Sequence, residues 1–429
     1  MLANKKLRNY GIAFLTVVLF AIYLILPSKP VSKKVPAFGG RMGDVTASSE
    51  YVNLQQAAEQ YRFEIRQNPD VVKNYVQLAQ LYLQQSRITG RHHEYVSEAQ
   101  KLLNEVLKRE PENFEAMITQ ASIYLKLHQF DRAKEVAEKA LAKNSFNAFA
   151  WGTLSDAKKE LGDYAGAVEA CDKMLSIRPD LRSYSRAAHL REIHGDLAGA
   201  RKAMRLACDA GVTGLESRAW ALYQLGNLYF KEGKLDTAEF IYKGILEERP
   251  NYTFAISGLA SVDFAYKNYK TAAQKLLQAY EIAPEHEFME KLVKVYRVSG
   301  KTETAKDLMA MLIDGFEQHE AQGWNINLEY ARFCLGNQID LTAAHDRMES
   351  EYRRRPHNVD VLETYAWALY KNNRFNDSQE IILKALRLNP HDARMNYKAG
   401  KIAEKLGQQE KAKTHFVKAG TLFLFNISS

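Results

Sequence analysis

Proline recurs in this chain at a fixed interval. Pro250 and Pro284 lie 34 residues apart, and so do Pro356 and Pro390. A period of 34 residues indicates an array of helical hairpins, because a single hairpin can bury its apolar face only against its neighbours. The sequence therefore predicts an all-α protein whose repeats fill residues 50–424.

The residues inside one period have the sizes that two packed helices need. In the unit that ends at Pro250, the small residues Gly226 and Ala238 allow the two helices to approach closely. Gly233 suits the left-handed turn that ends a first helix, and Pro250 stops the second helix because it lacks a backbone donor. The apolar stripe at helical spacing consists of Leu222, Leu225, Tyr229 and Tyr242.

These residues at these intervals resemble the tetratricopeptide repeat family. The pattern recurs over residues 50–424 as about ten units, after a leading half-unit that ends at Pro69. The resemblance implies a right-handed α-solenoid whose concave face binds a protein or peptide partner.

The resemblance also implies which side chains line the concave face. Aromatic side chains beside an asparagine there would suit recognition of an extended or helical segment. The alternative is that several of these aromatic residues pack against the preceding unit. Glu290 falls on the same face, and the candidates for partner binding are Arg186, His189, Trp220, Tyr223, Asn227, Phe230, Phe254, Phe264, Lys294, Arg297, Phe333, Trp367 and Tyr370.

The N-terminal region differs in composition from the repeats. Residues 1–9 are basic, and residues 10–27 form an apolar run of roughly 25 Å at about 1.5 Å per residue, near the lower limit for crossing a bilayer. We expect an uncleaved transmembrane signal anchor, because a small-residue cleavage site follows only at Ala37. Cleavage there would instead release a soluble exported binder. Residues 28–49, rich in Pro, Gly and Ser, predict a flexible linker.

The distribution of charge indicates on which side of a membrane the array lies, and it argues against one class of partner. Positive charge ahead of the apolar run favours a cytoplasmic N-terminus, hence a single-pass protein of a bacterial inner membrane with the array outside the cytoplasm. Residues 1–50 carry seven Lys or Arg against two acidic residues, so five of the eight net positive charges precede the repeats. The repeats are nearly neutral overall, which argues against nucleic acid as the partner.

The sequence predicts no catalytic residues, metal site or cofactor. Cys171, Cys208 and Cys334 lack the spacing of a metal or redox motif and are expected to be buried. A loose metal site in a surface insertion at His92-His93 is the weak alternative. The run Arg353-Arg354-Arg355 is expected to be a solvated face near a helix end.

We therefore expect a membrane-tethered, non-enzymatic scaffold that binds a protein or peptide. The alternative from a different class is an enzyme of unrecognised type or an obligate, non-catalytic subunit of an envelope enzyme complex. The chain ends with an apolar stretch and the tail 425–429. We expect this end to dock on the last hairpin or on a partner, for which a second copy, forming a homodimer, is one candidate.

Overall fold

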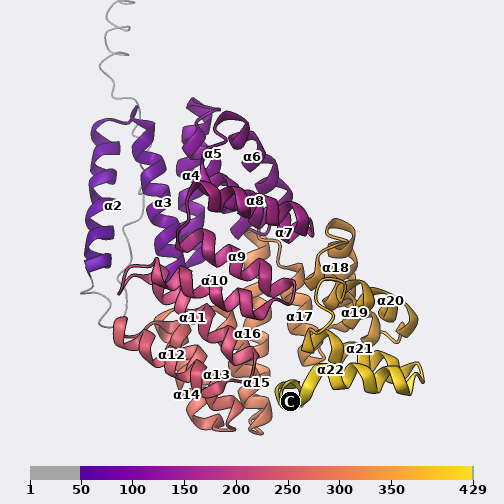
Figure 1. Cartoon of the computed structure of the whole chain (residues 1–429). Helices are drawn as coiled ribbons and strands as arrows, with labels where there is room; N and C mark the ends of the chain where they lie inside the picture. The colour runs from indigo at the N-terminus through magenta and orange to yellow at the C-terminus, as the bar shows by residue number, and fades with distance from the viewer. Residues whose placement is uncertain (1–48, 428–429) are drawn as a thin grey trace, which may run out of the picture.

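The computed structural model describes residues 49–427, and every regular element in that range is a helix. Figure 1 shows them following one another as a continuous array. The helices are α2 (Ser49–Gln67), α3 (Val72–Thr89), α4 (His92–Arg109), α5 (Phe114–Lys126), α6 (Phe130–Lys143), α7 (Ala148–Leu161), α8 (Tyr164–Ile177), α9 (Leu181–Ile193), α10 (Leu197–Asp209), α11 (Glu216–Lys231), α12 (Leu235–Glu248), α13 (Thr253–Ala265), α14 (Tyr269–Ile282), α15 (His286–Val298), α16 (Thr302–Ala321), α17 (Asn327–Asn337), α18 (Leu341–Arg354), α19 (Val359–Lys371), α20 (Phe375–Ala385), α21 (Ala393–Lys405) and α22 (Gln409–Ile427).

The helices pair into the hairpins that the proline period predicts. Each odd-numbered helix packs on the even-numbered helix that follows it, from α3–α4, hairpin 1, to α21–α22, hairpin 10. The helix α2 is the leading half-unit and ends just before Pro69. The prediction of an all-α array of about ten hairpins is confirmed.

The prolines that set the period also lie at fixed places relative to helix starts. Asn358 follows Pro356 by two residues and caps α19, accepting a hydrogen bond from the Val361 amide at 3.0 Å. Asp392 follows Pro390 in the same way and caps α21. At these two prolines one hairpin ends, and the polar residue two positions later starts the next helix with a cap worth about 1 kcal/mol. The helices that follow Pro250 and Pro284, α13 and α15, begin without a side-chain cap.

Glycine allows close packing within a hairpin. A Cβ atom added to Gly226 on α11 would lie 2.4 Å from the Tyr242 ring, which is fully buried. One added to Gly400 on α21 would lie 2.5 Å from the ring of Phe416. The predicted close approach of the two helices at Gly226 is confirmed, because the large ring of the second helix occupies the space that a side chain would need.

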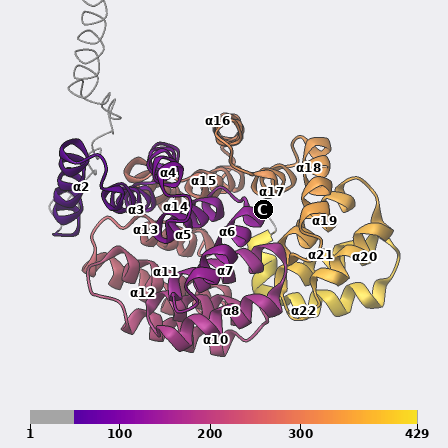
Figure 2. The same cartoon turned by 90° about the horizontal axis from the view of Figure 1, so that it is seen from above.

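The odd-numbered helices form the concave side of the array. Among the described helices, odd-numbered ones contact the next odd-numbered helix along most of the array, whereas even-numbered ones do so far less. A ribbon whose first helices crowd together and whose second helices spread apart must curve with the first helices inside. Figure 2 shows the array from above, with α2 at one side of the view and α18–α22 at the other.

Because the array curves into a superhelix, its second superhelical turn comes to lie on its first. Loops that follow α3, α5, α7 and α9 contact loops that precede α15, α17, α19 and α21, so hairpins 1–4 lie against hairpins 7–10. We call this contact the inter-turn seam. Its hydrogen bonds join Glu285 to His92 at 3.0 Å, Asn325 to Leu127 and His128 at 2.9 and 3.0 Å, Asn358 to Glu160 at 2.9 Å, and Val359 to Tyr164 at 2.9 Å.

The seam corrects two expectations. Arg355 is not part of a solvated face, because it is 3% exposed and its guanidinium bonds Glu351 at 2.5 Å and the Glu160 carbonyl at 3.1 Å. The insertion at His92-His93 is not a surface loop either. It lengthens α3 and begins α4, and it brings His92 to Glu285 in the seam.

The predicted membrane segment, residues 10–27, lies outside the described residues, as do the linker 28–48 and the side chains of the C-terminal tail. Between residues 49 and 427, no helix is both long and apolar enough to cross a bilayer.

Candidate functional site

The concave face of hairpins 8–10 carries a network of ion pairs. Asp360 on α19 bonds Arg332 of α17 at 2.6 Å and Arg394 of α21 at 3.3 Å. Glu363, one turn further along α19, pairs with Arg394 at 2.9 Å and with Lys398 at 2.6 Å. Three successive odd-numbered helices are thus tied together on the inner side, with three cations against two carboxylates.

Burial and charge act in opposite directions on these groups. Burial alone would raise the pKa of Asp360, but the guanidiniums of Arg332 and Arg394 hold that pKa well below its usual range. The same balance, with Arg394 and Lys398 as the cations, lowers the pKa of Glu363. Both carboxylates are therefore ionised at neutral pH, and the network keeps its surplus of positive charge.

Two aromatic side chains lie one and two turns beyond the carboxylates on the same helix. The rings of Trp367 and Tyr370 stack with centroids 4.5 Å apart and planes within 5° of parallel. The ammonium groups of Lys371 and Lys398 lie 5.3 and 5.4 Å from the centre of the Trp367 ring. Both rings are half-buried, so part of this platform faces solvent.

We call this set the C-terminal concave site: Arg332, Asp360, Glu363, Trp367, Tyr370, Arg394 and Lys398. Arg332 and Arg394 keep 36% and 44% of their side chains exposed, so each has donors left for a ligand. A flat aromatic surface next to cations suits a peptide that offers an apolar side chain and a carboxylate.

In the middle of the array, the chain itself occupies the predicted groove. Tyr223 is 5% exposed, contacts the rings of Tyr242 and Phe254, and donates to the Glu287 carboxylate at 3.4 Å. Asn227 accepts from the hydroxyl of Tyr242 at 2.7 Å. These side chains are thus engaged with one another from α11 to α15. The alternative expectation, packing against the preceding unit, describes Phe254, which contacts Tyr223 of the hairpin before it, whereas the contacts of Tyr223 lie in its own hairpin and in the two that follow.

The remaining candidates divide into two groups. The first group is engaged with other parts of the chain. Arg186 bonds Asp156 at 2.7 Å, and Arg297 bonds Asn337 at 2.9 Å. The Lys294 ammonium lies 5.0 Å from the centre of the Phe264 ring, the rings of Phe254 and Phe288 lie 5.4 Å apart, and Phe333 is 5% exposed. His189 is exposed, and Trp220 and Phe230 are half-buried against the core of hairpins 4–6. Trp367 and Tyr370 combine a partly exposed aromatic surface with a neighbouring network of ion pairs.

The sequence offered a signal for the charged residues of this site. Asp360 and Glu363 precede Trp367 by seven and four residues, so all three lie on one face of α19. The selection of groove residues favoured aromatic side chains and passed over these carboxylates. Lys398 and Arg332 are placed by the packing of α21 and α17 against α19, which one helix's periodicity does not reveal.

One constellation has the composition of a hydrolase triad. Ser86 Oγ lies 2.9 Å from His92 Nδ1, and His92 Nε2 lies 3.0 Å from the Glu285 carboxylate. Nucleophilic catalysis requires that the serine meet a substrate. Ser86 is fully buried, with Lys126 Nζ 3.5 Å from its oxygen, so these residues form a structural hydrogen-bond chain across the seam.

The cysteines follow their prediction. Cys171, Cys208 and Cys334 are free thiols and all three are buried. Burial raises the pKa of Cys171 and Cys334 to about 11 and that of Cys208 to about 12. Their role as small core residues is confirmed.

Comparison with known families identifies repeats in several parts of the chain. Models of the tetratricopeptide repeat match residues 96–155, 150–181, 220–252 and 364–414. The last of these segments includes the aromatic residues and Lys398 of the C-terminal concave site.

Curated relatives are distant and longer than this chain. A TPR repeat-containing protein of Pseudomonas aeruginosa is 27% identical over 195 residues, covering 43% of this chain and 32% of that protein. Cellulose synthase operon protein C of Pseudomonas fluorescens is 22% identical over 307 residues, covering 67% of this chain and 23% of that protein. A TPR repeat-containing protein of Methanocaldococcus jannaschii is 21% identical, covering 72% and 45%. The chain spans less than half the length of each.

Solved structures also resemble the array. A tetratricopeptide repeat protein from Parabacteroides merdae aligns with a TM-score of 0.43 and 19% identity, over 58% of this chain and 96% of that one. The human IFIT1 dimer aligns with a TM-score of 0.45 and 15% identity, over 87% and 88%.

Proposed function

We propose that this chain, an array of tetratricopeptide repeats, is a non-enzymatic scaffold that binds a protein partner at the C-terminal concave site. The fold is one that serves protein–protein interaction. Within it, the stacked Trp367 and Tyr370 beside the Arg394–Glu363–Lys398 network are the observation that carries the proposal. Aromatic and arginine side chains are the residues that dominate binding energy in protein interfaces.

The partner chemistry follows from the charge of the site. With three cations against two carboxylates, the site favours a segment that carries a carboxylate close to an apolar side chain. The segment's apolar side chain would cover the Trp367–Tyr370 platform, while its carboxylate would meet the exposed donors of Arg394.

Replacing Trp367 and Tyr370 together by alanine is expected to weaken partner binding by about 30-fold, the loss typical of a central aromatic anchor. Partners would first be identified by crosslinking in cells and mass spectrometry, and affinity would then be measured with the purified pair. Helicity by circular dichroism should stay unchanged, since both rings are only half-buried.

Phe240→Ala is the matched control. Phe240 is also aromatic and is 78% exposed, but it lies on the even-numbered helix α12, away from the concave side. Its replacement should leave affinity unchanged. Equal losses in the two variants would show that the partner does not use the concave face of hairpin 9.

The tether is part of the proposal. The apolar residues 10–27 behind a basic N-terminus would hold the scaffold at a bacterial inner membrane, with the array outside the cytoplasm. Carbonate extraction of membranes would leave an anchored protein in the pellet, whereas N-terminal sequencing that begins at Phe38 would mean that the exported form is soluble.

A second candidate function draws on one relative. Similarity to cellulose synthase operon protein C over 67% of this chain favours a non-catalytic subunit of an envelope enzyme complex. Copurification of a glycosyltransferase or another enzyme in stoichiometric amount would support that function over a free-standing adaptor.

A further inference from the structure

Two odd-numbered helices of the array carry the same pair of cations at the same places. In α21, Arg394 is the second residue and Lys398 is the sixth. In α9, Arg182 is the second residue and Arg186 is the sixth. Hairpins 4 and 10 therefore present equivalent cations on the concave side of the array.

The cations of hairpin 10 find their counterions on the preceding hairpin. Arg394 pairs with Asp360 at 3.3 Å and with Glu363 at 2.9 Å. Lys398 pairs with Glu363 at 2.6 Å. The two carboxylates are the second and the fifth residue of α19, so each cation of hairpin 10 is balanced within the chain.

Hairpin 3 has no carboxylate at these two places. The second residue of α7 is Phe149, and the fifth is Gly152. The Arg186 guanidinium lies 3.2 Å from where a Cβ atom of Gly152 would be, and it bonds Asp156, further along α7, at 2.7 Å. The Arg182 guanidinium lies 5.8 Å from the centre of the Phe149 ring, and it pairs with no carboxylate in the described part of the chain.

The surroundings of Arg182 are unfavourable for an unpaired cation. It lies in the first turn of α9, where the helix dipole favours negative charge. Partial desolvation lowers the pKa of Arg182, against the attraction of Asp180. The guanidiniums of Arg87, Arg186 and Arg178 lower it further, and each of these three already has a carboxylate of its own. Because Arg182 is exposed, a carboxylate from a partner can reach it.

The inter-turn seam places the two pairs of cations in line. The loop after α9 meets the loop before α21, since a Cβ atom added to Gly195 would lie 2.8 Å from the side-chain oxygen of Asn389. From Arg182 to the end of α9 the distance is roughly 17 Å, at about 1.5 Å per residue, and Arg394 lies at the start of α21. An extended segment whose two acidic residues are about seven positions apart, at about 3.3 Å per residue, would reach both arginines.

We propose that the C-terminal concave site continues across the inter-turn seam onto hairpin 4, where Arg182 binds a second carboxylate of the same partner segment. This contact rests on the proposed function, because the aromatic platform of α19 anchors the segment. The partner segment is therefore acidic at two places. One carboxylate meets Arg394, and the other supplies to Arg182 the counterion that Asp360 and Glu363 supply to Arg394.

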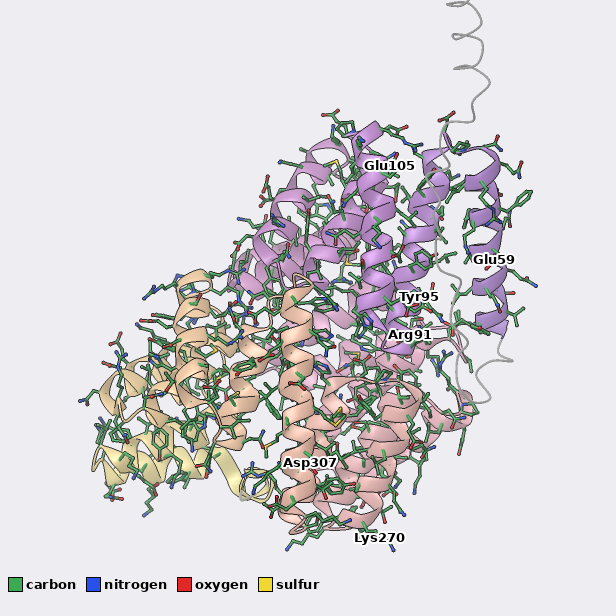
Figure 3. The ribbon with its side chains drawn as sticks, turned by 180° about the vertical axis from the view of Figure 1, so that it is seen from behind. Glu59, Arg91, Tyr95, Glu105, Lys270 and Asp307 are labelled. Atoms are coloured by element: carbon green, nitrogen blue, oxygen red, sulfur yellow. The ribbon has the colours of Figure 1, made fainter. Side chains whose placement is uncertain are left out.

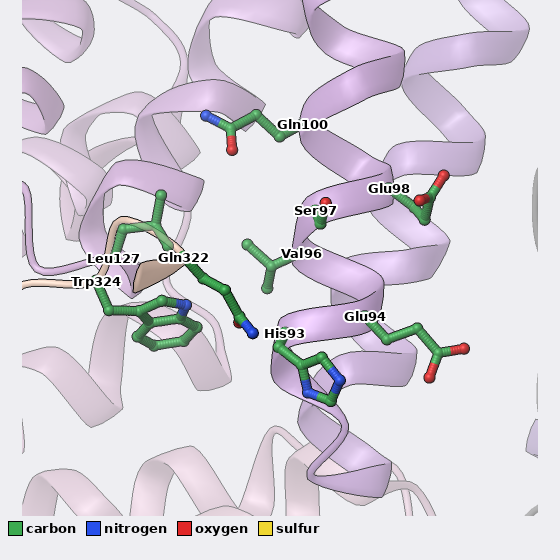
Figure 4. Close-up of a pocket in the computed structure, with 9 residues that line it drawn as sticks. All are labelled: His93, Glu94, Val96, Ser97, Glu98, Gln100, Leu127, Gln322 and Trp324. Carbon is green, nitrogen blue, oxygen red and sulfur yellow. The ribbon is translucent and has the colours of Figure 1, made fainter. Parts of the chain in front are cut away.

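An open cavity at another part of the seam does not suit such a segment. Figure 3 shows from behind the two helices beside it, α4, on which Tyr95 is labelled, and α16, on which Asp307 is labelled. The cavity has a volume of about 490 Å³, and Figure 4 shows Trp324 across it from α4. Glu94 and Glu98 are among the described residues that line it, and none of those residues is an arginine or a lysine. An acidic segment is therefore expected on the concave side and not in this cavity.

Two synthetic peptides labelled with fluorescein test the second contact. Both consist of serine and glycine with a leucine and a glutamate at one end. The first peptide carries another glutamate about seven positions further on, and the second peptide carries glutamine there. By fluorescence anisotropy, the full-length chain should bind the first peptide about 10-fold more tightly than the second, which is the gain typical of one charge-assisted contact.

Arg182→Gln should remove this preference, so that both peptides bind with the lower affinity. Its thermal midpoint should not fall, because the change removes one cation from a group of like charges. Arg191→Gln is the matched control. Arg191 lies on the opposite side of the same helix, is 55% exposed and pairs with Asp196 at 2.7 Å, so its replacement should keep the preference.

The variants also separate this contact from the proposed function. Replacing Trp367 and Tyr370 by alanine should weaken binding of both peptides, and if it does not, or if neither peptide binds the unsubstituted chain, the proposed function fails as well. If it does, but the unsubstituted chain binds both peptides equally or Arg182→Gln keeps the preference, only the second contact is wrong. Loss of the preference in Gln322→Ala instead of Arg182→Gln would place the segment in the cavity and would also contradict this contact.

Discussion

Replacing Glu351 by glutamine is expected to lower the free energy of unfolding by about 3 kcal/mol. Glu351 is fully buried at the end of α18 and accepts from Arg355 at 2.5 Å, Arg354 at 3.1 Å and Asn325 at 3.2 Å. Glutamine keeps the shape but removes the charge, which leaves the buried Arg355 guanidinium with Glu160 as its remaining carboxylate. A buried guanidinium that has lost its nearer carboxylate and keeps only the more distant one, at 3.2 Å, is the costly product of this change.

The loss should be concentrated at the seam. Since Arg355 also donates to the Glu160 carbonyl at 3.1 Å, the contact between hairpins 3 and 9 should lose hydrogen-exchange protection more than the rest of the array. Urea unfolding followed by circular dichroism measures the total effect.

Glu349→Gln is the matched control on the same helix. Glu349 pairs with Arg353 at 3.2 Å, but the two side chains are 41% and 73% exposed, and such a pair contributes about 0.5 kcal/mol or less. If Glu351→Gln costs no more than Glu349→Gln, the buried network around Arg355 does not form in solution.

Replacing Gly162 by alanine is expected to cost at least about 3 kcal/mol and to separate hairpins 3 and 9. Gly162 ends α7 with φ of +85°, and an added Cβ would lie 2.4 Å from the His357 carbonyl carbon and 2.6 Å from the Asn358 nitrogen. Backbone atoms cannot rotate away, so the two turns must move apart. The bond from Asn358 to the Glu160 carbonyl would break as they do.

Gly300→Ala is the matched control, because it introduces backbone strain without a clash between the two superhelical turns. Gly300 has φ of +79° in the equivalent turn of hairpin 7, and a Cβ there would meet nothing within 4 Å. It should cost only the strain of a left-handed alanine, about 1 kcal/mol. Small-angle scattering should show expansion for Gly162→Ala alone, and equal behaviour of the two variants would contradict the closed seam.

Much of the fold was predictable from local signals. Each hairpin repeats the same information, with a small residue at Gly226, a large ring at Tyr242 and a terminating Pro250, so the number and the limits of the hairpins followed from the period. Trp367 and Tyr370, the two aromatic residues of the C-terminal concave site, were among the candidates because the resemblance to the repeat family implies which face of a first helix is concave.

The rest of the candidate site could not be found in this way. Whether a concave side chain faces solvent depends on how tightly neighbouring hairpins curve. Tyr223 and Trp367 were both predicted to line the concave face. Tyr223 is buried and bonds Glu287, two hairpins further along, whereas Trp367 is only half-buried.

The amino-acid sequence by itself determined the helices, their pairing into hairpins and the side that is concave, because those features depend on residues within one or two periods of 34. Only the tertiary structure decided that hairpins 1–4 lie on hairpins 7–10. That contact results from small rotations that add up over six hairpins, and it joins loop residues such as Glu160 and Asn358, 198 positions apart, which no periodic pattern connects.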